Sequence, residues 1–288
     1  MVSPATHELS DGARQREARL VAWLAERGSV VVGFSGGVDS TYLACVALDA
    51  LGPERVLAVI GRSESYPVEQ WERAREIADR FTLPVLEVDT GELADPRYAA
   101  NPSNRCYFCK SELWSHLAPI ARERGFACVV DGTNADDVGD WRPGAAAARE
   151  QGVASPLAEL GFTKDEIRAL SRERGIPSWS QPSSPCLSSR IPYGTSVTVE
   201  RLREVEAAER ALRELGVRGD LRVRHHGALA RVELGGAELE RWLDGAARLR
   251  LRDAVRSAGF ARVALDLRGF RSGSLNLLGG VTSAAGVR

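Results

Sequence analysis

The sequence lacks the features that would direct the chain to a membrane, a nucleic acid or an oxidising compartment. No apolar run approaches the ~20 residues needed to span a bilayer, and residues 1–20 lack the apolar core of a signal peptide. The formal net charge is only −1, which gives the molecule as a whole no electrostatic reason to bind nucleic acid. We therefore expect a cytoplasmic protein without membrane or nucleic-acid partners. Its five cysteines are then thiols, metal ligands or reagents rather than disulfides.

The 288 residues suit two domains, or one large domain with an appendage, and no internal repeat is present. In the first half of the chain, apolar strands alternate with helices, which predicts an α/β fold built on an open, doubly wound parallel sheet. We expect a first strand that starts at residue 30 and further strands at 56–60, 84–88 and 127–130. We expect helices at 12–27, 39–51, 67–81, about 105–125 and about 145–150.

The second half follows a different pattern. Thr163 to Glu166 fits a capping box and predicts a helix start. The proline-rich stretch Pro177–Gly194 then has no usable periodicity and predicts an ordered loop or linker. Beyond it we expect a helix at 198–215, strands at 221–225 and 229–234, a helix at 237–258 and a strand at 262–267. These elements predict a smaller C-terminal α+β domain, so the chain divides into residues 1–180 and 181–288.

A glycine-rich turn follows the first strand directly. Residues 30–40, VVVGFSGGVDS, run from β-forming residues through glycines into a helix. Glycines allow backbone N–H groups to approach an anion, and the helix N-terminus favours negative charge there, so the segment predicts a phosphate-binding loop. It is not a Walker motif, because Gly-Lys-Ser/Thr is absent. The alternative is a βα turn that binds no ligand. Ser35, Arg62, Asp89 and Asp131 are all expected at the carboxyl ends of strands, where such sheets bind ligands.

The cysteines fall into two groups. Cys106 and Cys109 form a C-x-x-C at a predicted helix start, where they could share a metal, act as a redox pair or be ordinary helix residues. A zinc site would need two more ligands, and the sequence has no second C-x-x-C, although His116 could supply one. Cys45 and Cys128 lie in apolar segments and are expected in the core.

Cys186 differs from the other cysteines because it lies in a proline-bounded loop, SPCLSSRIP, with Arg190 four residues further on. A thiol held near a cation has the surroundings that a nucleophilic cysteine needs. We therefore interpret Cys186 as the catalytic cysteine.

The motifs together resemble a known family. SGGVDS resembles the PP-loop of ATP pyrophosphatases, which split ATP into AMP and pyrophosphate. SGGVDS, NRCYFCK, DGTNADDVGDWRPG, SPCLSSRIPYG, RVRHHGALARVEL and DLRGFRSGSLN, in this order, resemble the LarE family of ATP-dependent sulfur transferases. This resemblance runs from the first strand nearly to the C-terminus. It implies a PP-loop domain followed by a smaller domain that binds substrate and helps to form a homo-oligomer.

The resemblance also implies a reaction and a set of site residues. ATP with Mg²⁺ adenylates a carboxylate of pyridinium-3,5-biscarboxylic acid mononucleotide, a small-molecule partner, and the carboxylate becomes a thiocarboxylate in nickel-pincer nucleotide cofactor biosynthesis. The implied ATP-binding residues are Gly33, Ser35, Gly36, Gly37, Asp39 and Ser40. Arg222 and Arg224 alternate on one strand face and match positions that bind the substrate phosphate; the alternative is a solvated strand face. Arg271, Ser272 and Ser274 are implied near the substrate or a subunit boundary, and Glu209 and Glu233 near a divalent cation.

The resemblance leaves two sources for the sulfur. Cys186 either gives up its own sulfur and becomes dehydroalanine, or it joins Cys106 and Cys109 in holding a [4Fe–4S] cluster whose open iron carries sulfide. We favour the cluster, because the C-x-x-C has no other clear role.

Three other functions compete with this interpretation. A PP-loop tRNA thiolase would need a basic RNA-binding surface, and a synthetase that uses glutamine ammonia would need a glutaminase domain or partner. The non-enzymatic alternative is a module that binds ATP without cleaving it. Release of pyrophosphate on addition of the pyridinium substrate separates these alternatives from a LarE-type enzyme.

Overall fold

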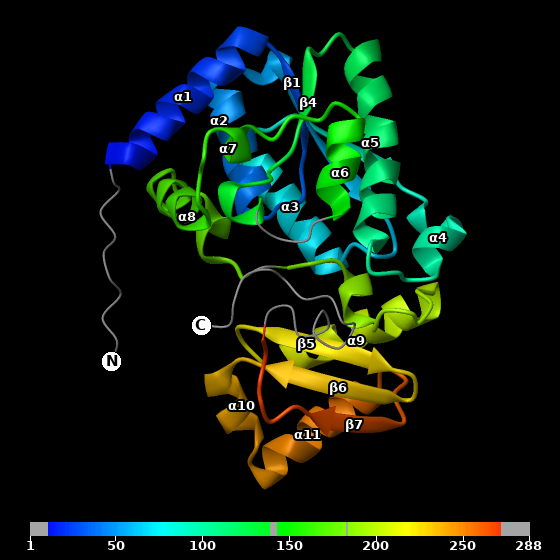
Figure 1. Ribbon diagram of the computed structural model, residues 1–288. Coiled ribbons are helices and arrows are strands. Elements are labelled where there is room, and N and C mark those ends of the chain that lie inside the picture. The colour runs from blue at the N-terminus through cyan, green and yellow to red at the C-terminus, as the bar shows by residue number, and fades with distance from the viewer. Residues whose placement is uncertain (1–10, 139–142, 183, 272–288) are drawn as a thin grey trace.

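The computed structural model describes residues 11–138, 143–182 and 184–271. In these residues no helix is both long enough and apolar enough to cross a membrane. The described chain forms an upper unit around a four-stranded sheet and a lower unit around a three-stranded sheet (Figure 1).

The four-stranded sheet is entirely parallel, as the sequence predicts. Its strands are β1 (Val30–Gly33), β2 (Val56–Arg62), β3 (Val85–Asp89) and β4 (Cys128–Val130), in the order β3-β2-β1-β4. The strands are rich in Val, Leu and Ile because helices cover both faces of the sheet. The order of the strands reverses between β1 and β4, which makes this place the topological switch point of the sheet. Such sheets bind ligands at the switch point, outside the carboxyl ends of the strands.

Helices on the two faces of the sheet create two separate cores. Val30, Val32 and Ile60 point to one face and pack with residues of α1 (Asp11–Arg27), α2 (Val38–Leu51), α3 (Val68–Phe81) and α8 (Lys164–Glu173). Val31 and Val59 point to the other face and pack with α5 (Arg105–Glu123) and α6 (Pro143–Glu150). Two short helices, α4 (Pro96–Ala99) and α7 (Pro156–Glu159), complete the unit. The predicted capping box at Thr163 and Glu166 is confirmed.

The lower unit contains α9 (Val199–Glu214), β5 (Leu221–His226), β6 (Leu229–Leu234), α10 (Gly236–Trp242), α11 (Gly245–Arg256) and β7 (Arg262–Leu265). Its sheet is mixed, since β5 and β6 pair antiparallel whereas β6 and β7 pair parallel. The prediction of a single helix at 237–258 is wrong, because the structure has two helices there. The chain breaks at Leu243 and Asp244, where an Asp-Gly pair favours a turn, and α11 then begins as a separate helix.

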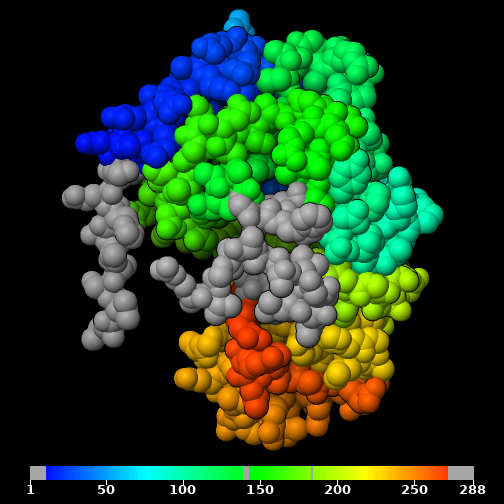
Figure 2. All heavy atoms as spheres, in the orientation of Figure 1, coloured from blue at the N-terminus to red at the C-terminus, as the bar shows by residue number. Residues whose placement is uncertain are grey.

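The segment around Cys186 joins the two units. It contains the 3₁₀ turns η4 (Pro177–Ser180) and η5 (Leu187–Arg190), in agreement with the predicted ordered loop. Leu187 and Ile191 pack with Tyr98 of the upper unit and with Val205 of α9 in one small apolar cluster. Figure 2 shows this yellow-green segment lying between the upper unit and the yellow-to-red lower unit.

Candidate active site

The glycine-rich turn leads from β1 into α2. Gly36 has a φ of +65°, and a Cβ atom added to it would lie 2.7 Å from the Cβ of Ala74 in α3, so this position requires glycine. Gly37 is the N-cap of α2 and provides no side-chain cap. Ser40 Oγ lies 3.1 Å from Ser35 Oγ and accepts a hydrogen bond of 3.2 Å from the Ser35 N–H. Gly33 ends β1 beside them. A helix N-terminus with glycines and hydroxyls around it is suited to bind phosphate oxygens.

Asp39, in the first turn of α2, pairs with a lysine that the sequence analysis missed. Lys164 at the start of α8 places its Nζ 2.5 Å from Asp39 Oδ2. The other carboxylate oxygen, Asp39 Oδ1, is buried and has no hydrogen-bond partner among the described residues. A buried oxygen that lacks a partner, beside hydroxyls and a phosphate-binding turn, fits a ligand of Mg²⁺, which prefers oxygen donors.

The strand ends lie as predicted. Arg62 and Asp89 are the last residues of β2 and β3, and Arg62 Nε donates to Asp89 Oδ1 at 3.0 Å. Beyond β4, Gly132 lies so close to the start of α2 that a Cβ atom added to it would be 2.8 Å from the Ser40 nitrogen. A cavity of about 750 Å³ opens on this side, between α5, α6 and α7, and Thr133, Asp137, Arg149 and Ser155 are among the residues that line it.

The three cysteines of the implied set lie on two segments, the start of α5 and the Cys186 loop, which are joined by a hydrogen bond of 3.1 Å from Arg105 NH1 to the Ser188 carbonyl. Cys106 and Cys109 lie in the first turn of α5, and Cys186 is the N-cap of η5. Burial, and then the negative charge of a Cys186 thiolate, raise the pKa of Cys106 even though part of this residue is exposed. Burial also raises the pKa of Cys109, with Glu92 and Cys186 adding to the effect. Cys186 thus acts electrostatically on both other thiols.

No group of three or more His, Cys, Asp or Glu side chains in the described ranges is arranged to hold a single metal ion. His116, considered as a zinc ligand, instead places its Nε2 3.2 Å from Glu112 Oε1, one turn away on the same helix. Cys45 is buried in the core of the upper unit, as expected. Cys128 is half-buried at the start of β4.

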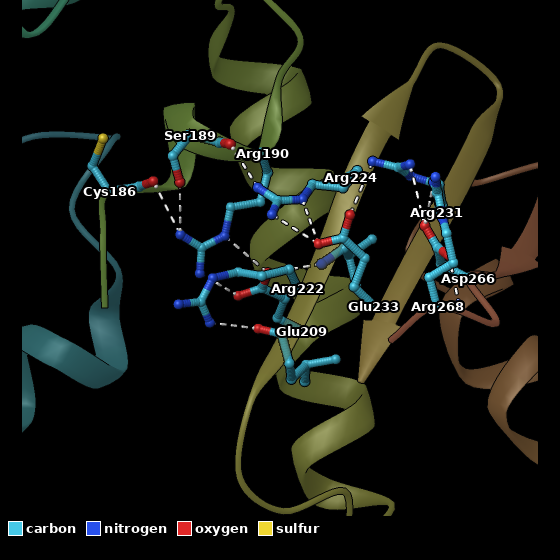
Figure 3. A network of polar contacts seen from close by, with 12 residues as sticks. Cys186, Ser189, Arg190, Glu209, Arg222, Arg224, Arg231, Glu233, Asp266 and Arg268 are labelled. Carbon is cyan, nitrogen blue, oxygen red and sulfur yellow. Dashed lines mark hydrogen bonds and ion pairs between the residues drawn. The ribbon is translucent and has the colours of Figure 1, made fainter. Parts of the chain in front are cut away.

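Arg190 does not contact the Cys186 thiol, which corrects the sequence-based interpretation. Its guanidinium donates to the carbonyl oxygens of Pro185 and, at 3.1 Å, Cys186. The same guanidinium forms two hydrogen bonds of 2.9 Å with Glu209, so a carboxylate neutralises its charge. Figure 3 shows the Cys186 sulfur pointing away from Arg190 and the Cys186 carbonyl pointing toward it. Arg190 therefore holds the loop, and a second guanidinium, that of Arg105, donates to the Ser188 carbonyl of the same loop at 3.1 Å.

Arg222 and Arg224 lie on β5 and are each only 5% exposed, so the alternative of a solvated strand face is wrong. Arg224 NH2 lies 2.8 Å from Glu233 Oε2, and its NH1 donates to the Ser189 carbonyl at 3.0 Å. Arg222 lies over the Phe270 ring, with its Cζ 5.0 Å from the ring centroid. Burial and the neighbouring charge of Arg190 lower the pKa of Arg222 to about 10.

The two glutamates implied near a divalent cation are both engaged by arginines (Figure 3). Burial alone would raise the pKa of Glu209, but the Arg190 guanidinium more than offsets this effect and lowers it. Glu233 is 1% exposed and also pairs with Arg231 at 2.9 Å. Arg271 is exposed at the end of the described chain, and Ser272 and Ser274 lie outside the described residues.

A parallel sheet with an SGGxDS turn at its switch point defines the chain as an enzyme of the PP-loop ATP pyrophosphatase class, which uses ATP. Residues 18–103 match the NAD synthase family. An uncharacterised protein from Synechocystis sp. is 44% identical over 88% of this chain and 94% of its own length. The pyridinium-3,5-bisthiocarboxylic acid mononucleotide synthase of Lactiplantibacillus plantarum is 39% identical over 91% of this chain and 94% of its own length.

The chain therefore belongs to the LarE family of the PP-loop superfamily. More distant similarity extends to the glutamine-hydrolysing GMP synthase of Aeropyrum pernix, which is 31% identical over 64% of this chain but only 39% of that protein.

Proposed function

We propose that this protein is an ATP-dependent sulfur transferase. It converts a carboxylate of pyridinium-3,5-biscarboxylic acid mononucleotide into a thiocarboxylate in the biosynthesis of the nickel-pincer nucleotide cofactor. The observation that carries the proposal is the position of Cys186. Its loop hydrogen-bonds to the upper unit through the Leu187 N–H and Ser65 carbonyl, 2.8 Å apart, and to the lower unit through Arg190 and Glu209. The Cys186 loop thus lies between two parts of the molecule. One is the upper unit, which carries the PP-loop, and the other is the group of buried arginines formed by Arg190, Arg222 and Arg224.

The first step is adenylation. The substrate carboxylate attacks the α-phosphorus of ATP, an acyl-adenylate forms and pyrophosphate leaves. Gly33, Ser35, Gly36, Gly37 and Ser40 bind the phosphates through backbone N–H groups and hydroxyls. Asp39 would hold Mg²⁺, which when bound would neutralise charge on the leaving pyrophosphate. Lys164, beside Asp39, adds a positive charge at the same place.

Arg222 and Arg224 bind the phosphate of the mononucleotide. Their burial in a low-dielectric site strengthens a charge-assisted hydrogen bond, and the repulsion of Arg222 by Arg190 is relieved when an anion binds. We assign Arg271 to the same substrate. Glu209 and Glu233 orient the arginines, and a divalent cation at these two carboxylates would compete with Arg190 and Arg224 for them.

The second step moves sulfur. In one route the Cys186 thiolate attacks the acyl carbon, AMP leaves and a thioester forms. Loss of the Cys186 α-proton to a base then breaks the Cβ–Sγ bond and leaves dehydroalanine and a thiocarboxylate. In the other route, which we favour, a [4Fe–4S] cluster held by Cys106, Cys109 and Cys186 would supply sulfide in place of the cysteine sulfur.

We further infer that residues 1–180 form the PP-loop domain, that residues 181–288 carry the donor loop and the substrate-binding unit, and that the chain acts as a homo-oligomer. The separate apolar cores of the two sheets support the division.

The nucleotide products test the proposed function. Purified protein with ATP, Mg²⁺ and the pyridinium mononucleotide should form AMP and pyrophosphate only when the mononucleotide is present. Formation of ADP and orthophosphate would reject the assignment, and so would pyrophosphate release that depends on tRNA or ammonia instead.

A further inference from the structure

Arg105 is a buried guanidinium whose neighbours differ from those of the buried Arg190 and Arg224. It begins α5 and is 4% exposed. Buried arginines are almost always neutralised by a carboxylate, as Arg190 is by Glu209 and Arg224 by Glu233. Among the described residues, Arg105 forms no ion pair with an Asp or Glu; its NH1 donates to the Asn101 side chain and, at 3.1 Å, to the Ser188 carbonyl.

The titratable groups that act most strongly on the Arg105 guanidinium are two thiols and two phenols. They come from three segments and are Cys186, Cys106, Tyr98 and Tyr193. The Arg105 Cζ lies 5.8 Å from the centroid of the Tyr193 ring. Burial alone would lower the pKa of Arg105, but these groups, with Cys186 first among them, raise it. Thiols and phenols, rather than carboxylates, are thus the groups that stabilise the positive charge of Arg105.

Asn101 fixes both Arg105 and the chain that follows Cys186. It is fully buried, with a φ of +56°, a conformation that asparagine adopts more readily than most residues. Its side-chain N–H groups donate to the carbonyls of Pro192 and Thr195, each at 2.8 Å, and Ile191 at 3.2 Å. Its side-chain oxygen accepts from Arg105. One asparagine therefore uses its whole side chain to join the start of α5 to the Cys186 loop.

We propose that Arg105, oriented by Asn101, is a positioning residue of the sulfur site that fixes the Cys186 loop and places a buried positive charge beside the Cys186 and Cys106 sulfurs. This inference rests on the proposed function for its purpose. The sulfur that is transferred is anionic whichever source supplies it, and a charge in a buried site acts more strongly than one in water. A guanidinium held by two hydrogen bonds provides that charge at a fixed position.

The charge beside Cys186 can be measured without ATP or substrate. Iodoacetate is anionic and iodoacetamide is neutral, but both alkylate a thiolate, so the ratio of their rates at one pH reports the local charge and cancels any change in thiolate fraction. We would measure this ratio at Cys186 by peptide mass spectrometry on the full chain, freed of iron by a chelator under anaerobic conditions.

In Arg105→Met the iodoacetate-to-iodoacetamide ratio should fall about fivefold, because one nearby positive charge is lost. It should stay within about twofold of wild type in Arg105→Lys, which keeps the charge. Arg122→Met is the matched control, since Arg122 is an exposed arginine near the end of the same helix, and its ratio should equal that of wild type.

A ratio in Arg105→Met equal to that of wild type would overturn the proposal, because a residue needed only for folding would slow or speed both reagents alike. If Arg105→Met does not fold, Asn101→Ala keeps the guanidinium but releases it, and the ratio should then fall at least about twofold. An unchanged ratio would contradict the proposal in that variant as well. The proposed function can fail separately. If the ratio falls in Arg105→Met as expected but the wild-type protein makes no thiocarboxylate, the proposed function is rejected and the position of the Arg105 charge is not.

Discussion

At the scale of single residues, positive charge concentrates where β5 meets the Cys186 loop. Arg190, Arg222 and Arg224 lie around Glu209 and Glu233, and all of them are buried except Glu209, which is partly buried. The lowered pKa of Arg222 reflects its burial and the repulsion by Arg190. Removing the Arg222 charge should therefore affect the binding of an anion more than it affects folding.

Arg222→Met should weaken binding of the pyridinium mononucleotide by about 2–3 kcal/mol, because a charge-assisted hydrogen bond to phosphate is lost. Calorimetric titration measures this affinity, and the affinity for ATP should stay unchanged. Arg218→Met, which removes an exposed arginine just before β5, is the control and should bind like wild type. An equal loss of ATP affinity in Arg222→Met would place Arg222 in the nucleotide site instead.

Asp39→Asn should slow pyrophosphate release about 100-fold, since the carboxylate that would hold Mg²⁺ becomes neutral. The rate is measured with a coupled pyrophosphate assay at saturating ATP. Asp49→Asn changes an aspartate on the same helix that pairs with Arg174 far from the turn, and it should keep the wild-type rate. Comparable rates for the two variants would contradict a metal-binding role for Asp39.

At the scale of elements, the four-stranded sheet could be predicted because each of its strands and helices has its own local pattern. The apolar runs of β1 and β2, the glycines before α2 and the capping box of α8 are all contiguous in sequence. The break between α10 and α11 was not predicted, because an Asp-Gly pair within a helical pattern is a weak local signal.

The sulfur site could be predicted only in part. The cysteines are marked by their own motifs. The loop partners of Asn101, however, lie 90 to 94 residues further along the chain, and Ser188, the loop partner of Arg105, lies 83 residues further along. No local pattern reveals such contacts. The same limit explains the error over Arg190, whose partner Glu209 is on α9.

Gly36→Ala tests the phosphate-binding turn as an element. The change adds strain at a positive φ and places a methyl group 2.7 Å from Ala74, so the free energy of unfolding should fall by about 2–4 kcal/mol. Gly28→Ala is the control, because Gly28 has a φ of +76° but no atom within 4 Å of the added Cβ. It should lose only about 1 kcal/mol in chemical denaturation. Equal losses would show that α3 does not constrain the turn.

At the scale of the whole molecule, a short segment after β2 contacts the glycine-rich turn, the Cys186 loop and the lower unit. Ser65 accepts from Leu187 in the Cys186 loop, and the Val68 N–H, at the start of α3, donates to Glu206 of α9 at 2.7 Å. Tyr66, between them, donates to the Ser35 carbonyl of the PP-loop at 3.0 Å. The glycine-rich turn, the Cys186 loop and the lower unit are thus joined within a few residues, as the proposed two-step transfer would require.

The favoured sulfur source predicts an iron content. Protein purified without oxygen should contain about four iron atoms per chain, and Cys106→Ser, Cys109→Ser and Cys186→Ser should each lose most of them. Cys128→Ser changes a half-buried cysteine on β4, and this variant protein should keep the iron content of the wild type. Iron and sulfide assays make the comparison. Iron-free wild-type protein whose mass falls by one hydrogen sulfide at Cys186 during turnover would establish the sacrificial route instead.

The most direct test of sulfur transfer is the mass of the product. Wild-type protein with ATP, Mg²⁺, sulfide and the pyridinium mononucleotide should yield a mononucleotide in which one oxygen is replaced by sulfur, with one AMP formed for each sulfur transferred. Cys186→Ala should bind ATP normally and yield no such product. Pyrophosphate release without a sulfur-containing product, or an unchanged yield from Cys186→Ala, would contradict the assignment of this chain as a sulfur transferase acting through Cys186.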